Sequence, residues 1–122
     1  MSRILVAEDS ADIREILQIG LSQKGFEVVL AHDGSQALEI ALTGTVDLAI
    51  LDILMPQLSG IEVLHQIRAA NMRQIPVILL SALITRPEQA KGFAAGANAY
   101  IIKPFHLTEV VSEVRKLLSA HP

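Results

Sequence analysis

Side chains with the chemistry for phosphoryl transfer follow several short apolar runs in this sequence. They are an acidic pair, a single aspartate, a hydroxyl and a lysine, in the order Glu8 and Asp9, Asp52, Ser81, Lys103. Carboxylate oxygens without histidine or cysteine are the donors that a hard cation such as Mg²⁺ prefers. An aspartate beside Mg²⁺, a lysine and a hydroxyl can accept a phosphoryl group, because the positive charges neutralise the phosphoryl oxygens. The residue types therefore indicate an acyl phosphate site, provided that the fold brings them together.

The apolar runs are typical of strands buried on both faces of a parallel sheet. Strands are expected at residues 3–7, 27–31, 48–52, 76–80 and 99–102. Segments with helical spacing separate them, and in the first of these Ile13, Ile16, Leu17 and Leu21 recur as one buried face. Strand and helix alternate five times, which predicts an α/β fold, a doubly wound five-stranded parallel sheet with five helices on its two faces. Ligands of such sheets bind beyond the carboxyl ends of the strands, where the candidate side chains stand.

Capping residues and breakers indicate where the helices begin and end. Asp9 or Ser10 suits the N-cap of the first helix. Pro87 suits the first turn of the fourth helix and Gly96 its end. The fourth helix has small residues and only Phe93 as a large apolar anchor, so we expect it to be the most mobile of the five helices.

Composition excludes several classes of protein. The 122 residues suffice for one domain, and the absence of cysteine rules out disulfides and thiolate metal sites. Ten basic and thirteen acidic side chains give a net charge of −3 and no basic cluster, so no direct contact with nucleic acid is expected. The N-terminus does not resemble a signal peptide, and no apolar stretch reaches the roughly 18 residues of a membrane helix. We expect a cytoplasmic protein with no membrane partner.

Taken together and in order, the motifs resemble the receiver domain of two-component response regulators. They are Glu8-Asp9, Asp52-Ile53-Leu54-Met55-Pro56, Ser81-Ala82, Tyr100 and Lys103-Pro104-Phe105, within a match from about residue 3 to residue 120. The resemblance implies a flavodoxin-like sheet with strand order 2-1-3-4-5. It also implies a single receiver domain over residues 1–122, with no output domain in this chain. The chain would be either a single-domain regulator or a receiver cut from a longer protein.

The resemblance implies a metal and phosphorylation site at Asp52, the expected phosphoryl acceptor. Asp9, Asp52 and the main-chain carbonyl of Leu54 would ligate Mg²⁺, for which Mn²⁺ could substitute. Glu8 would contact the cation through a water molecule or would contact one of these ligands instead of the cation. Lys103 would bridge Asp52 and then a phosphoryl oxygen.

The same resemblance implies a switch that responds to the phosphoryl group. Ser81 would donate its hydroxyl to that group, and Tyr100 would change rotamer when Ser81 moves. The Lys103–Pro104 peptide bond is expected to be cis. The surface formed by the fourth helix, fifth strand and fifth helix would then control an output domain or a partner protein.

The implied partner is a histidine kinase or a histidine phosphotransfer protein. The chain's own histidines lack metal-ligand spacing and are interpreted as surface residues, so phosphohistidine would come from the partner: His32, His65, His106 and His121. The receiver would catalyse transfer to itself and its own slow dephosphorylation, acting as a switch rather than a turnover enzyme. Receivers that dimerise through acidic residues often read Gly-Ala-Asp-Asp-Tyr, whereas this chain reads Gly-Ala-Asn-Ala-Tyr at residues 96–100. We therefore expect a monomer or weak dimer.

Other interpretations have to be weighed against this one. A haloacid-dehalogenase-like phosphatase would need a second aspartate two residues after Asp52, where Leu54 stands. A dinucleotide-binding protein would need glycines after the first strand, where Glu8 and Asp9 would repel a pyrophosphate. A receiver-like interaction module without phosphorylation is the third alternative. Individually, the acidic pair could cap a helix, Ser81 and Lys103 could be solvated, and Tyr100 could simply pack.

Overall fold

The computed structural model describes residues 1–70, 74–82 and 85–121 of the chain. Five strands and five helices alternate along it. In chain order they are β1 Arg3–Ala7, α1 Ala11–Gln23, β2 Glu27–Ala31, α2 Gly34–Ala41, β3 Leu48–Asp52, α3 Gly60–Ala69, β4 Val77–Ser81, α4 Arg86–Ala94, β5 Ala99–Ile102 and α5 Leu107–Ala120. The alternation predicted from the sequence is confirmed, with strand ends that differ by a residue only at β4.

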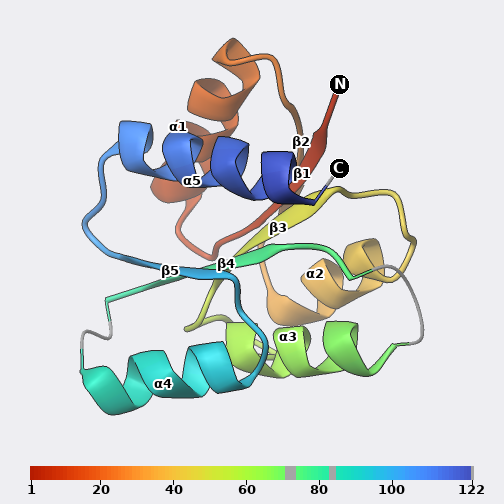
Figure 1. The fold of residues 1–122 in the computed structure, drawn as a ribbon, viewed down its shortest axis with the longest axis vertical. Coiled ribbons are helices and arrows are strands. Elements are labelled where there is room, and N and C mark those ends of the chain that lie inside the picture. Colours follow the sequence, from red (N-terminus) through yellow and green to blue (C-terminus); the bar gives the residue numbers. More distant parts are fainter. Residues whose placement is uncertain (71–73, 83–84, 122) are drawn as a thin grey trace.

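The strands form one parallel sheet in the order β2-β1-β3-β4-β5. Helices α1 and α5 cover one face, and α2, α3 and α4 cover the other (Figure 1). All five residues of β3 and of β4 are buried, as expected of central strands with helices on both sides. The predicted doubly wound flavodoxin-like fold is therefore confirmed, and all five strands end at the same edge.

Each face of the sheet has its own aliphatic core. Alternate strand residues enter the two cores, as the period of a strand requires. Leu5 and Leu51 pack with α2 and α3, whereas Ile4 and Ile50 pack with α1 and α5. The side chains at the strand ends are therefore held by a rigid platform.

Local hydrogen bonds explain where the helices begin. The hydroxyl of Ser10 accepts from the backbone N–H of Ile13, which identifies Ser10 as the N-cap of α1. Ser59 and Glu62 form a reciprocal capping box at the start of α3. This cap fixes the point at which the loop after β3 turns into a helix.

Two expectations about helix packing are wrong. Ile16 is 52% exposed, because the buried side of α1 is formed by Leu17, Gly20 and Leu21. Phe93 is 49% exposed, and Gly92 is the buried residue of α4. Both helices place a glycine against the protein where a larger residue was expected.

Within the described ranges, no helix combines the length and the apolar character needed to span a membrane.

Candidate functional site

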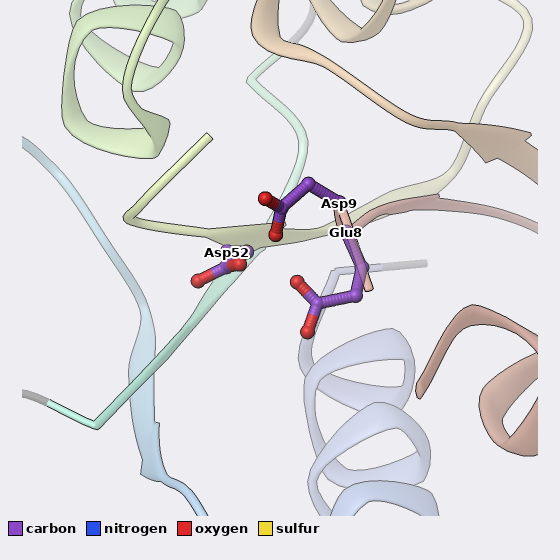
Figure 2. A group of neighbouring side chains, drawn as sticks. All are labelled: Glu8, Asp9 and Asp52. Atoms are coloured by element: carbon purple, nitrogen blue, oxygen red, sulfur yellow. The ribbon is translucent and has the colours of Figure 1, made fainter. Parts of the chain in front are cut away.

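Three carboxylates meet beyond the ends of β1 and β3. Glu8 and Asp9 follow β1 directly, and Asp52 is the last residue of β3. The two strands are neighbours, with Ala7 paired to Leu51, so the next residues of each strand lie side by side. One oxygen from each carboxylate lies within 4.8 Å of the others, and Figure 2 shows the three groups together. The sequence prediction that these acids converge is confirmed by this geometry.

Burial differs sharply among the three. Glu8 has no exposed surface and Asp52 is 3% exposed, whereas Asp9 is open to solvent. Like charges this close repel each other strongly when water is excluded. A positive charge has to compensate for this repulsion.

Lys103, which follows the edge strand β5, supplies that charge. It follows β5, which is separated from β3 by β4, so its long side chain reaches across a strand. Its ammonium lies 2.5 Å from Glu8 Oε1 and 3.2 Å from Asp52 Oδ2. The Lys103–Pro104 peptide bond is cis. One ammonium thus neutralises part of the charge on two buried carboxylates.

The protonation of Glu8 and Lys103 reflects this environment. Burial and the hydrogen bond with Asp52 raise the pKa of Glu8 to about 7, although Lys103 opposes the change. Burial alone would lower the pKa of Lys103, but its contacts with Glu8 and Asp52 outweigh burial and raise it. The lysine therefore stays charged, while Glu8 can take up a proton near neutral pH.

The second oxygen of Glu8 is orphaned. Within the described part of the chain, Oε2 is buried and has no hydrogen-bond partner. A buried carboxylate oxygen without a partner is costly, and a cation or a cation-bound water would satisfy it. Three neighbouring carboxylates, two of which share a single lysine, are a donor set suited to a hard divalent cation.

The loop after β3 shapes the floor around Asp52. The backbone N–H of Leu54 donates to Asp52 Oδ1 at 3.2 Å, which fixes the carboxylate. Gly60 packs so closely that a Cβ atom there would lie 2.3 Å from the Asp52 carbonyl oxygen. At Gly34, a Cβ atom would lie 1.9 Å from the carbonyl oxygen of Leu58. Two glycines at helix starts thus let the loop lie close to the sheet edge.

Arg14 is a site residue that the sequence reasoning missed. Its Nη1 donates to the carbonyl oxygens of Glu8, at 2.6 Å, and Asp9, at 3.1 Å. The guanidinium of α1 thus holds the backbone of the acidic pair. No sequence pattern predicts a contact between a side chain and main-chain carbonyls. The two glycines could have been found, since each opens a helix where a bulkier residue is usual.

Ser81 and Tyr100 occupy different positions relative to the carboxylates. Ser81 ends β4, is 1% exposed, and lies one residue beyond the partner of Asp52 in the register. Its carbonyl oxygen accepts from the backbone N–H of Lys103 at 2.8 Å. Tyr100 lies earlier on β5, half-buried, with its ring centroid 6.4 Å from that of Phe93. The structure therefore brings Ser81 to the same sheet edge and places Tyr100 beneath α4.

Comparisons with known proteins show the family of the chain. Residues 4–115 match the family described as the response regulator receiver domain. The transcriptional regulatory protein CusR of Escherichia coli K12 is 40% identical over 116 residues, which cover 95% of this chain and 51% of CusR. The response regulator MprA of Mycobacterium ulcerans is 41% identical over 116 residues, 95% of this chain and 50% of MprA. The chain thus spans about half the length of these curated relatives.

Solved structures show the same fold. The receiver domain of the Francisella response regulator 1452 superposes with a TM-score of 0.95 at 31% identity, covering 100% of both chains. The response regulator TrrA of Thermotoga maritima, solved in complex with Mg²⁺-BeF, has a TM-score of 0.85 at 38% identity. That likeness covers 96% of this chain and 99% of TrrA. TrrA is thus a protein of this fold that was solved with Mg²⁺ and a beryllofluoride group bound.

Proposed function

The chain belongs to the response regulator receiver domain family of two-component systems, and on that premise we propose that Asp52 is its phosphoryl acceptor. One observation carries the proposal: the Asp52 carboxylate lies among two other carboxylates and 3.2 Å from the Lys103 ammonium. Glu8 is fully buried, and Asp9 is exposed outside the contact with Lys103. Asp52 is therefore the carboxylate best placed between a metal, a lysine and an incoming phosphoryl group.

In the transfer step, an Asp52 carboxylate oxygen attacks the phosphorus of a partner's phosphohistidine. The new P–O bond forms as the P–N bond breaks, and the imidazole leaves with the electron pair. Lys103 then exchanges its contact with Asp52 for one with a phosphoryl oxygen. Ser81 donates its hydroxyl to another. Catalysis here is mainly positioning and charge neutralisation, because the histidine is already a good leaving group.

The cation expected at this site is Mg²⁺. Asp9, Asp52 and the Leu54 carbonyl would ligate it, and Glu8 would act through a bound water. The orphaned Oε2 of Glu8 and the cluster of three carboxylates, of which two share one lysine, support this assignment. When bound, the cation supplies positive charge to the phosphoryl oxygens. Mn²⁺ is expected to substitute, because it also favours octahedral oxygen ligands.

The phosphorylated state is read on the surface formed by α4, β5 and α5. Ser81 moves toward the phosphoryl oxygen, and Tyr100 changes rotamer in response. Gly92 supports this coupling, since a Cβ atom there would lie 2.8 Å from Leu79 and 3.3 Å from the Tyr100 ring. The switch resets by slow hydrolysis of the acyl phosphate at the same site.

A histidine kinase or a histidine phosphotransfer protein is the proposed donor. An output domain or a separate target protein is the proposed recipient of the signal, supported by relatives about twice as long as this chain. Residues 1–122 form one receiver domain in this proposal.

Intact mass spectrometry with acetyl phosphate tests the assignment. One labile addition of a phosphoryl group is expected with Mg²⁺ or Mn²⁺, and none in excess EDTA. Asp52→Asn should abolish the addition, whereas Asp12→Asn, an exposed position in the first turn of α1, should leave it intact. Phosphorylation of Asp52→Asn, or phosphorylation in EDTA, would overturn the proposal.

A further inference from the structure

Helices α1 and α5 cover one face of the sheet (Figure 1). A cleft lies between the C-terminal end of α1 and one side of α5. The helices touch at Gly20, where a Cβ atom would lie 2.2 Å from Leu107 Cδ2. The cleft has a volume of about 320 Å³ and is lined by residues from the end of α1 and one side of α5: Lys24, Leu107, Thr108, Val111, Ser112 and Arg115. None of them belongs to the acidic cluster of Asp52.

Two cations without carboxylate partners face this cleft. Over the described ranges, neither Lys24 nor Arg115 has a carboxylate within ion-pair distance, and the lining contains no acidic residue. The neighbouring Lys116, in contrast, lies 3.8 Å from Glu113. In a chain where acids outnumber bases by thirteen to ten, two such cations at one cavity favour an anionic occupant.

The remaining lining defines the rest of the ligand. Thr108 and Ser112 stand four residues apart on α5, so their hydroxyls point to the same side as Arg115. Leu107 and Val111 contribute hydrocarbon surface between them. We propose that this cleft binds a small amphipathic anion, with one carboxylate or phosphate group between the cations and a hydrocarbon body on the two aliphatic side chains.

The size of the cleft favours a small molecule over a protein. Ligand cavities range from roughly 300 to 1,000 Å³, and this one falls at the small end. A stable protein partner would need to bury about 800 Å² on a broad surface. An anion of about ten non-hydrogen atoms fills such a cavity and reaches the cations with its acidic group.

Nuclear magnetic resonance titration of the full chain tests the site with octanoate and phenyl phosphate. Saturable shifts of the backbone amides of residues 108–115 are expected from at least one of them, and the two probes distinguish a carboxylate from a phosphate ligand. Neutral 1-octanol and inorganic phosphate should each bind at least fivefold more weakly than the better probe. Equal binding of either control, or the absence of saturable shifts, would overturn the proposal.

Substitutions locate the anion in the cleft. Lys24→Gln and Arg115→Gln should each weaken binding at least fivefold, because each removes one partner charge. Lys116→Gln is the matched control on the same helix and should change binding less than twofold. A similar loss in Lys116→Gln would show a diffuse charge effect and reject the site.

Filling the cleft separates shape from charge. Ser112→Trp keeps both cations and should abolish octanoate binding while the Asp52 site still responds to beryllofluoride. Unchanged binding in Ser112→Trp would place the anion elsewhere and refute the proposal. If that variant fails to fold, Lys24→Gln and Arg115→Gln decide the question alone.

Discussion

The Lys103 ammonium and the Glu8 carboxylate lie 2.5 Å apart, although 95 residues separate them along the chain. Glu8 leaves β1 and Lys103 leaves β5, with β3 and β4 between the two strands. The contact spans the central strands of the sheet and encloses Asp52 on one side. Any change of charge at Asp52 therefore acts on both partners at once.

Glu8 makes the stability of the protein dependent on pH. The pKa of its carboxyl group rises from 4.5 to about 7 on folding, mainly through burial. Between these values the folded state holds more protons than the unfolded state, so the free energy of unfolding falls as pH rises. In EDTA, we expect the free energy of unfolding to decrease by a value on the order of 2 kcal/mol from pH 5 to pH 8. Urea unfolding followed by circular dichroism measures it, since the chain has no tryptophan.

The control for this pH effect removes only the titrating group. Glu8→Gln should flatten the dependence, and Glu39→Gln, on the exposed side of α2, should not. Saturating Mg²⁺ should also reduce the slope, because the cation competes with the proton. An unchanged slope in Glu8→Gln would contradict the assignment.

Lys103 should transmit the phosphoryl charge rather than hold the metal. Lys103→Ala removes the ammonium next to two carboxylates, so Mg²⁺ should bind as tightly as before or up to about tenfold more tightly, a gain of ~1.4 kcal/mol. The beryllofluoride-induced resonance shifts near Tyr100 should largely disappear. Magnesium titration and nuclear magnetic resonance measure the two effects, with Lys116→Ala as the control. Full shifts in Lys103→Ala would refute the coupling.

The Ser81 hydroxyl should matter more for the response to phosphorylation than for the acceptance of the phosphoryl group. Its side chain is buried at the end of β4, and Ser81→Ala removes the hydroxyl without opening a large cavity. We expect Ser81→Ala to accept a phosphoryl group from acetyl phosphate, with a smaller change at Tyr100. Ser35→Ala, an exposed hydroxyl on α2, should behave as the parent protein does. Parent-like Tyr100 shifts in Ser81→Ala would disprove this role.

The sheet was predictable because the five apolar runs leave few other arrangements, and the site followed from the edge where parallel strands end. The orientation of α1 could not be predicted from the sequence. Isoleucine spacing predicted a buried Ile16, but Gly20 faces α5 because Leu107 needs that space. Arg14 was also missed, because its partners are backbone carbonyls that no residue pattern reveals. Residue spacing reports periodicity, whereas these contacts depend on the distance between elements.

Arg68 should contribute strongly to stability, because it also donates hydrogen bonds to backbone carbonyls. Its guanidinium donates to the carbonyl oxygens of Ile75 and Gly96 and to the side-chain oxygen of Asn98. These contacts join the end of α3 to the start of β4 and to the turn after α4. Arg68→Met should lower the free energy of unfolding by about 3 kcal/mol, since several carbonyls lose charged donors.

Urea unfolding measures the loss, with Arg86→Met at the exposed start of α4 as the control. Arg68→Lys should be intermediate, because an ammonium cannot reproduce the planar fork. Equal stability of Arg68→Met and Arg86→Met would show that these hydrogen bonds contribute little.

The composition of the turn between α4 and β5 predicts weak self-association. Residues 96–100 contain no acid, and the Asn98 side-chain oxygen accepts from Arg68 Nη2 at 3.0 Å and from the Val77 N–H at 2.9 Å. This side chain is therefore engaged within its own chain. On α4, Lys91 lies 3.8 Å from Glu88 of the same helix. This turn thus supplies no acid for ion pairs across a symmetric α4–β5–α5 interface. Of the two basic candidates on that surface, Lys91 is already paired, whereas Arg115 has no carboxylate partner among the described residues.

Surface ion pairs contribute only about 0–1 kcal/mol each, but a two-fold interface counts every pair twice. Losing two acids per subunit should therefore weaken such a dimer substantially, and we expect a monomer at micromolar concentration even with Mg²⁺ and beryllofluoride.

Phe93 and Ile102 are partly exposed on the same face, so an apolar contact is the competing source of association. Sedimentation equilibrium of the activated protein distinguishes a monomer from a dimer held by ion pairs or by apolar contact. A tight dimer that Lys91→Glu or Arg115→Glu breaks would show that ion pairs do form, whereas one broken only by Phe93→Ser would show that apolar contact replaces them. Either dimer would contradict the expected monomer.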